Sequence, residues 1–187
     1  MKKKSLALVL ALAMIVVCVV GGTLAWLTAT TPEVKNTFTA GDINITLAES
    51  ENLDLKMIPG YTITKDPKVT VKAGSEKCYL FVKVAESDNF DDFMTYDMAA
   101  GWTALTGVNG VYYREVETST ANQEFAVLKD NQVTVRGDVT KGMLNALTEA
   151  TRPTLTFTAY AVQLNKNNTT EFTAAEAWAL AETLPTT

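Results

Sequence analysis

The sequence predicts a mainly β protein, an antiparallel β-sandwich of the jelly-roll kind with two or three short helices. Seven or eight short stretches rich in Val, Thr, Tyr and Phe alternate apolar with polar residues, as half-buried strands do, and turn residues separate them. Between these stretches there is no strand–helix–strand unit long enough for a parallel crossover. Short alternating strands without such crossovers favour two antiparallel sheets packed face to face.

The first 25 residues have the three parts of a secretory signal. Three lysines open the chain, an uncharged apolar run follows from residue 6 to residue 20, and a Gly-Gly pair ends the run. Thr23 and Ala25 then place small residues three and one positions before a cleavage site between Ala25 and Trp26. We therefore expect a secreted protein of the extracellular matrix or cell surface, which meets the membrane only through its leader.

Three rival interpretations of the leader fit the residues less well. A retained membrane anchor needs about twenty apolar residues, and no charge occurs between Ser5 and Pro32, but the glycine pair and the threonines after it favour cleavage. Lipidation of Cys18 would need a small residue where Val17 stands. A type IV pilin keeps its apolar helix after cleavage, whereas here the apolar run precedes the boundary.

The composition excludes several kinds of chemistry. The chain has no histidine, so it has neither a Ser-His-Asp nor a Cys-His mechanism, and no HExxH zinc helix. Of its two cysteines, Cys18 lies in the leader, and Cys78 is left without an intrachain disulfide partner after cleavage. We expect Cys78 to be an inert core residue rather than a cross-link between subunits. No cofactor is predicted.

The charge balance argues against a nucleic-acid partner. The formal net charge is −5, with 16 basic and 21 acidic residues. Loss of the three leader lysines leaves 13 basic residues against the same 21 acidic ones, a net charge of −8. Because neutralisation of phosphates supplies most of the affinity for nucleic acid, so acidic a chain is a poor binder.

After the leader, residues 26–37 form a threonine-rich arm that we expect to be extended, and residues 38–187 form the sandwich domain. Ile43, Ile45 and Leu47 alternate with polar residues as in a first strand, and Pro59-Gly60 marks a turn before strands at 61–64 and 68–72. The strongest strand is predicted at 78–85. Its two faces are Cys78, Leu80, Val82 and Val84 on one side, and Tyr79, Phe81 and Lys83 on the other.

The second half mixes strands with short helices. Residues 87–110 are irregular, with a short helix near 91–94, and strands are predicted at 111–116 and 155–164. Asp130-Asn131 is expected to be the turn of a hairpin between 125–129 and 132–136. A helix is predicted over 139–150, with Thr140 as its N-cap, an apolar face of Met143, Leu144 and Leu147, and an end at Arg152-Pro153.

The last predicted element is a short helix from Thr173 to Ala181. Thr173 and Glu176 form the sequence pattern of a capping box, in which each side chain bonds the other residue's backbone N–H. Trp178 is expected to dock this helix onto the sandwich.

The first half of the chain contains an ordered series of short motifs: Gly21-Gly22-Thr23-x-Ala25, Asn36-x-Phe38-x-x-Gly41, Pro59-Gly60, Lys65-Asp66-Pro67-x-Val69, Gly74, and Tyr79 to Val84. This series resembles the camelysin/TasA family of exported proteins of Gram-positive bacteria. The chain departs from the family in two places: Thr28-Ala29 stands where members often have an Asp soon after the cleavage point, and Val71-Lys72 stands where they often have an Asn.

The resemblance implies a jelly-roll sandwich whose leader is removed by a SipW-type signal peptidase and which assembles into biofilm-matrix fibres with itself or related matrix proteins. In such fibres the N-terminal arm of one subunit completes the sheet of the next. An exposed sheet edge offers unpaired backbone groups that an extended segment can satisfy. The candidate donor strand here runs from Trp26 to Phe38, and Leu27, Val34 and Phe38 are its candidate assembly residues.

Two alternatives to the fibre hypothesis have their own candidate residues. Some members of the family are labelled metalloendopeptidases, but without histidine a metal would need carboxylates alone, which suit Ca²⁺ better than a hydrolytic zinc. Asp88, Asp91 and Asp92, with Asp97 nearby, are weak calcium candidates, and solvated loop acids explain them more simply. A monomeric surface or membrane-anchored binding module would use an exposed aromatic surface, for which the candidates are Trp102, Tyr112 and Tyr113.

Overall fold

The computed structural model describes residues 41–50 and 56–183. The chain divides into two compact units, 1–39 and 40–187, and every described residue belongs to the second. The predicted leader and arm lie outside the described residues, so the cleavage residues Thr23, Ala25 and Trp26 and the arm residues Leu27, Val34 and Phe38 remain predictions.

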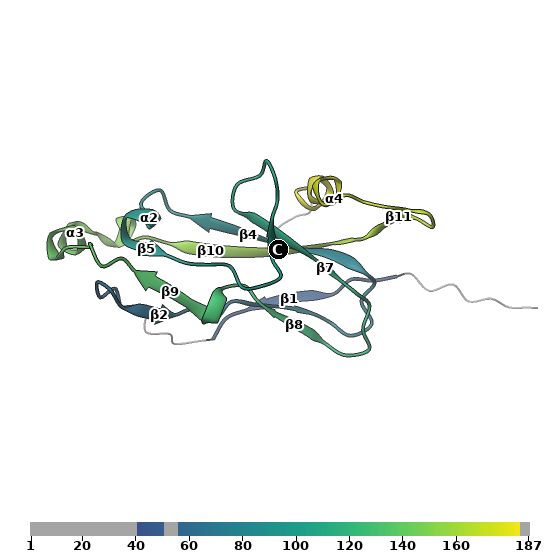
Figure 1. The fold of residues 1–187 in the computed structure, drawn as a ribbon, viewed down its shortest axis with the longest axis horizontal. Coiled ribbons are helices and arrows are strands. Elements are labelled where there is room, and N and C mark those ends of the chain that lie inside the picture. The colour runs from purple at the N-terminus through teal and green to yellow at the C-terminus, as the bar shows by residue number, and fades with distance from the viewer. Residues whose placement is uncertain (1–40, 51–55, 184–187) are drawn as a thin grey trace, which may run out of the picture. The chain divides into compact units, whose positions relative to one another are not determined.

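The described part of the chain is an antiparallel β-sandwich with short helices, which confirms the predicted fold class (Figure 1). A four-stranded sheet in the order β10-β4-β7-β6 faces two three-stranded sheets, β1-β3-β8 and β2-β9-β5, across an apolar core. The bounds are β1 Ile45–Ala48, β2 Thr62–Thr64, β3 Lys68–Val71, β4 Cys78–Glu86, α2 Phe90–Phe93, β5 Met94–Thr95, β6 Thr103–Ala104, β7 Val111–Val116, β8 Gln123–Ala126, β9 Gln132–Val135, α3 Lys141–Ala146, β10 Leu155–Gln163, β11 Asn165–Asn167, β12 Thr170–Glu171 and α4 Ala174–Ala181.

Strand β4 lies at the centre of the four-stranded sheet and is buried on both faces. It pairs with β10 over nine residues and with β7 on its other side. The face of Cys78, Leu80, Val82 and Val84 points into the sandwich core, while Tyr79 and Phe81 point to the opposite side of the sheet. The two faces predicted from the sequence are therefore confirmed.

Helix α4 covers the second face of β4. Its capping box forms as predicted, with the Thr173 N–H donating to Glu176 Oε2 at 3.0 Å and the Glu176 N–H donating to Thr173 Oγ1 at 3.3 Å. Hydrogen bonds from the Lys166 ammonium and from Thr173 hold the pKa of Glu176 at about 2. Trp178 is buried, with its ring centroid 5.4 Å from those of Phe81 and Tyr160, so its predicted docking role is confirmed.

The two other helices form close to their predicted places. Helix α2 begins one residue earlier than expected. Helix α3 has the predicted cap, with the Met143 N–H donating to Thr140 Oγ1 at 3.2 Å, and its apolar residues pack on Ile63, Val135 and Val139. It ends at Ala146 rather than at residue 150, because Thr148 hydrogen-bonds Thr151 and starts a separate 3₁₀ turn.

The predicted hairpin around Asp130-Asn131 is wrong. Both residues take the positive φ of 54° that suits a tight turn, but β8 pairs with β3, and β9 pairs with β2 and β5. The reason lies just before the turn, where Val127 and Leu128 are both fully buried. Because consecutive strand residues point to opposite faces, two buried neighbours carry the chain from one sheet to another.

Gly110 is required by a close approach between two strands. Its φ is +71°, and its carbonyl accepts a hydrogen bond from the Val84 N–H at 2.7 Å. A Cβ at this position would lie 2.5 Å from the Val84 carbonyl oxygen. Gly107 also has a positive φ, of +82°, but no atom lies within 4 Å of a Cβ there.

We predict that Gly110→Ala destabilises the domain far more than Gly107→Ala. A left-handed backbone costs an alanine about 1–2 kcal/mol at either site, and at Gly110 the strand must also shift, which brings the expected loss to about 3 kcal/mol. Urea unfolding followed by circular dichroism measures both free energies. Equal losses in the two variants would show that the approach to Val84 does not constrain the fold.

Candidate functional site

An open apolar groove lies between the first residues of β10 and strand β2. Its volume is about 800 Å³. Phe90 and Val133, both buried, form its floor together with Met94, and Ile63 and Leu155 stand on its two sides. The groove is thus built from helix α2 and from strands β2, β5, β9 and β10, which are far apart in the sequence.

Both sides of this groove are strands at the edge of a sheet. Among the described residues, β10 pairs only with β4, and β2 pairs only with β9. An edge strand presents a row of backbone N–H and C=O groups without partners in its own sheet, and such a row is a template for a further strand. A groove bordered by two such edges can hold an extended peptide by backbone pairing.

Among the described residues that line the groove, the charged ones are all basic. They are Lys56, Lys65 and Arg152. Lys65 is held in place by Glu49, whose carboxylate oxygens lie 2.9 and 3.0 Å from its Nζ, and its Nζ lies 5.5 Å from the centre of the Phe157 ring. In a chain with a net charge of −5, this apolar and basic surface differs from the average of the protein.

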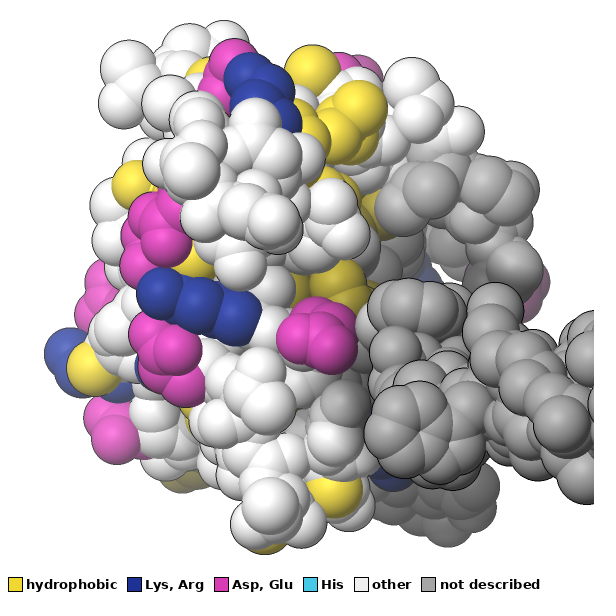
Figure 2. All heavy atoms as spheres, turned by 90° about the vertical axis from the view of Figure 1, so that its right-hand side faces the viewer, with side chains coloured by type: hydrophobic (Ala, Val, Ile, Leu, Met, Phe, Trp, Pro, Cys, Tyr) yellow, Lys and Arg dark blue, Asp and Glu magenta, His cyan; other side chains and the backbone are white. Residues whose placement is uncertain are grey.

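The described chain enters the sandwich at the other end of the sheets. Gly41 packs against Glu76, and the Glu76 N–H donates to the Asp42 carbonyl at 3.0 Å, just beyond the end of β3. Figure 2 looks at this end, where basic side chains lie beside acidic ones, as in the pairs that Lys77 makes with Glu117 at 3.1 Å and Glu171 at 3.7 Å. Ion pairs therefore border the point near Gly41 where the described chain enters, whereas the groove is lined mainly by apolar residues.

The acidic residues singled out in the sequence are not gathered into a metal site. Asp91 and Asp92 lie in the first turn of α2, Asp88 precedes them, and Asp97 Oδ2 lies 3.4 Å from Lys129 Nζ. Within the described ranges, no three acidic or cysteine side chains come close enough to hold one metal ion. Asp91 and Asp97 instead line a second, polar cavity of about 800 Å³.

Two further titratable groups are shielded from solvent, Cys78 fully and Tyr96 in part. Burial raises the pKa of the Cys78 thiol to about 11, so the thiol is protonated and unreactive at neutral pH, which fits the expected core role. Burial, together with a hydrogen bond from the Tyr96 hydroxyl to Glu86 Oε1 at 2.6 Å, raises the pKa of Tyr96 far above its ordinary value. Tyr96 is therefore a neutral donor.

The aromatic residues proposed as a ligand surface lie in two different places. Trp102 and Tyr112 pack against the sandwich core, while Tyr113 packs on the opposite face of the sheet beside Tyr79 and Phe81. They do not form one surface. The sequence predicted a functional role neither for the residues that line the groove nor for Arg114, whose side chain lies between the rings of Trp102 and Phe125.

The described residues define an antiparallel β-sandwich in which β10 and β2 are edge strands beside an apolar groove. The model of the family described as camelysin metallo-endopeptidase matches residues 1–96. Because this match covers half of the chain, the protein belongs to the camelysin family, and the resemblance drawn from its first half is confirmed. No curated protein and no solved structure matches the chain. In the described residues, no helix has the length and apolar character needed to cross a membrane.

Proposed function

We propose that this protein is an exported, non-enzymatic structural protein that assembles outside the cell by strand addition, as a subunit or accessory of biofilm-matrix fibres. A SipW-type signal peptidase removes the leader between Ala25 and Trp26. The arm of residues 26–37 then occupies the groove between β2 and β10 of another copy. The observation that carries the proposal is this groove with its two open strand edges.

The chemistry of the groove suits a strand with alternating apolar residues. Successive side chains of a strand point to opposite faces, so every second residue of an added strand would meet the floor of Phe90, Met94 and Val133. The backbone of the same strand would pair with an open edge, which is the physical basis of binding by strand addition. Val34 and Phe38 lie an even number of residues apart and would meet the floor together, whereas Leu27 would point to the opposite face of the added strand.

The groove and the entry point of the described chain lie at opposite ends of β10, and this favours a chain of copies over a closed dimer. Leu155 borders the groove at one end of β10, and Gln163 at the other end pairs with Cys78, near the point where the described chain enters. Eight residue steps separate them, which is about 26 Å along a strand. Donor and acceptor surfaces at opposite ends make a head-to-tail contact, and such a contact propagates unless its rotation closes a ring.

A blocked edge of the groove tests the proposal. Thr156 is exposed, lies on the edge strand β10 and lines the groove, so Thr156→Trp places a large side chain beside any strand that is added to this edge. We expect the secreted chain, with Trp26 as its first residue, to form polymers visible by electron microscopy, and Thr156→Trp or deletion of residues 26–37 to leave monomers in size-exclusion chromatography. Thr170→Trp is the matched control, because Thr170 is also an exposed strand threonine and lies on the hairpin of β11 and β12.

The runner-up function makes the opposite prediction. If folded wild-type protein stays monomeric at all concentrations, or if neither Thr156→Trp nor the deletion changes its assembly, the fibre hypothesis fails. A monomeric surface or membrane-anchored binding module of the same fold would then describe the protein better. Circular dichroism of each variant shows whether a loss of assembly reflects a blocked groove or a loss of fold.

The description of the matching family favours a second candidate, a metallo-endopeptidase. The absence of histidine in the chain supports the structural function instead, because hydrolytic zinc sites draw on imidazole ligands. We expect the purified protein to leave casein intact, with or without added zinc, and a chelator to change nothing. Casein cleavage that co-purifies with the protein and stops on chelation would establish the enzyme.

A further inference from the structure

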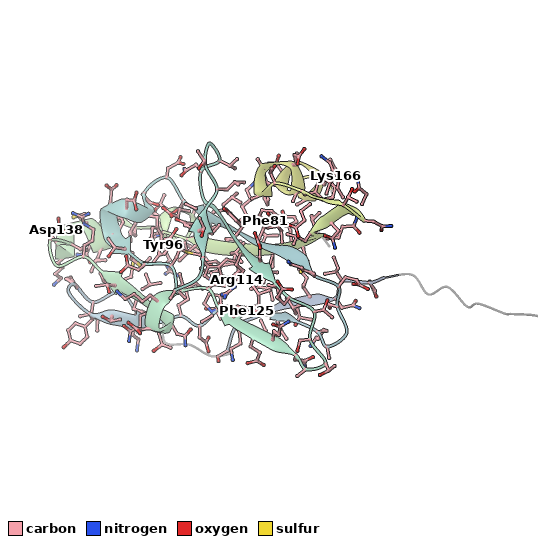
Figure 3. All side chains as sticks on the ribbon, turned by 45° about the vertical axis from the view of Figure 1, so that its right-hand side comes forward. Phe81, Tyr96, Arg114, Phe125, Asp138 and Lys166 are labelled. Atoms are coloured by element: carbon pink, nitrogen blue, oxygen red, sulfur yellow. The ribbon has the colours of Figure 1, made fainter. Side chains whose placement is uncertain are left out.

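Arg114 lies between two aromatic rings from different sheets. Its Cζ is 4.0 Å from the centre of the Phe125 ring, which belongs to β8, and 5.4 Å from that of Trp102, which precedes β6 (Figure 3). The Trp102 ring is fixed by a hydrogen bond from its Nε1 to the Ala126 carbonyl at 2.8 Å. Cation–π contacts of this kind stabilise the guanidinium in its place between the rings.

The backbone at Gly101 also fits the guanidinium. Gly101 has a φ of +88°, and a Cβ there would lie 3.0 Å from Arg114 Nη2 and 3.3 Å from Cζ and Nη1. A side chain at this position would require the Arg114 guanidinium to shift by a few tenths of an ångström. The stack of Trp102, Arg114 and Phe125, closed by Gly101, is therefore a built cradle, here called the arginine slot.

The guanidinium in the slot has no acceptor among the described residues. Arg114 pairs with Leu80 across β7 and β4, so it shares the inner face of the sheet, where its Nε is closed off from solvent without a hydrogen-bond partner. No carboxylate of the described chain lies within ion-pair distance of it. By contrast, Arg136 is bound through both Nε and Nη2 by Asp138.

We propose that the arginine slot is a recognition site for a carboxylate on a partner chain, the side chain of an aspartate or glutamate in an exposed segment. The terminal Nη atoms are not closed off from solvent as Nε is, and they can offer two parallel N–H groups to one carboxylate. Partial burial strengthens such a pair, since water screens it less. A chain with 21 acidic residues makes a second copy a ready source of the carboxylate.

The slot is separate from the groove, so the two proposals stand independently. Trp102 precedes β6 and Phe125 lies on β8, the edge strands of their sheets on one side of the sandwich, whereas the groove lies between β10 and β2. A carboxylate bound in the slot would join copies side by side, or attach a different acidic chain, without occupying the strand-addition groove.

The experiment follows the Nε–H resonance of Arg114 by NMR while blocked tripeptides are added to the Thr156→Trp chain, which is expected to be monomeric. Acetyl-Gly-Glu-Gly-amide should shift this resonance and the Trp102 indole resonance saturably. Acetyl-Gly-Gln-Gly-amide should bind at least about tenfold more weakly, since it lacks the charge that makes the paired hydrogen bonds strong. Inorganic phosphate at equal ionic strength should also be the weaker ligand.

Matched variants separate recognition from packing. Arg114→Lys keeps the charge but loses the planar fork, so it should weaken binding of the glutamate peptide about tenfold. Arg136→Gln is the control and should leave the affinity unchanged, because Arg136 is already paired with Asp138.

Equal binding of the glutamate and glutamine peptides, or no saturable shift with either, would overturn the proposal, and so would tighter binding of phosphate. The peptide comparison uses the native Arg114, so it decides the matter even if Arg114→Lys does not fold.

Discussion

The burial of both faces of β4 is the constraint on which the rest of the structure depends. Its backbone pairs with β10 and β7. Cys78, Leu80, Val82 and Val84 fill the sandwich core, and Tyr79 and Phe81 hold helix α4 against the outside of the sheet. A strand with two apolar faces is stable only when both are covered. The opposing sheets and α4 supply the two covers. Among the described residues, β10 is an edge strand of this sheet.

The two sides of the sandwich end in different ways. On the side of β6 and β8, Trp102, Arg114 and Phe125 stack across the gap between the sheets. On the side of β10 and β2, the described residues leave a groove above Phe90 and Val133. An edge left open over an apolar floor is a liability that proteins usually cover, and an added strand from another copy would cover it.

The sequence predicted the features that depend on local chemistry. The two faces of β4 follow from the alternation of its residues, and the caps at Thr140 and Thr173 follow from side chains that bond the next turn. The turn at Asp130-Asn131 forms, but the two strands on either side of it do not pair with each other as predicted. The burial of Val127 and Leu128 directs these strands into different sheets.

The groove and the arginine slot could not be predicted in the same way. Each is made by residues from segments that only the tertiary fold brings together, such as Ile63, Phe90 and Leu155 in the groove. One signal for the slot was present in the sequence: in strand 111–116, Arg114 shares a face with Tyr112 and Val116, and a charge on such a face needs a special environment.

Head-to-tail strand addition is tested most directly by mixing two variants that cannot polymerise alone. The chain without residues 26–37 keeps a groove but has no arm, and Thr156→Trp keeps the arm but has a blocked groove. Strand addition predicts that the mixture forms a heterodimer of one copy each, measured by light scattering after size-exclusion chromatography. Two folded monomers that never associate in the mixture would contradict it.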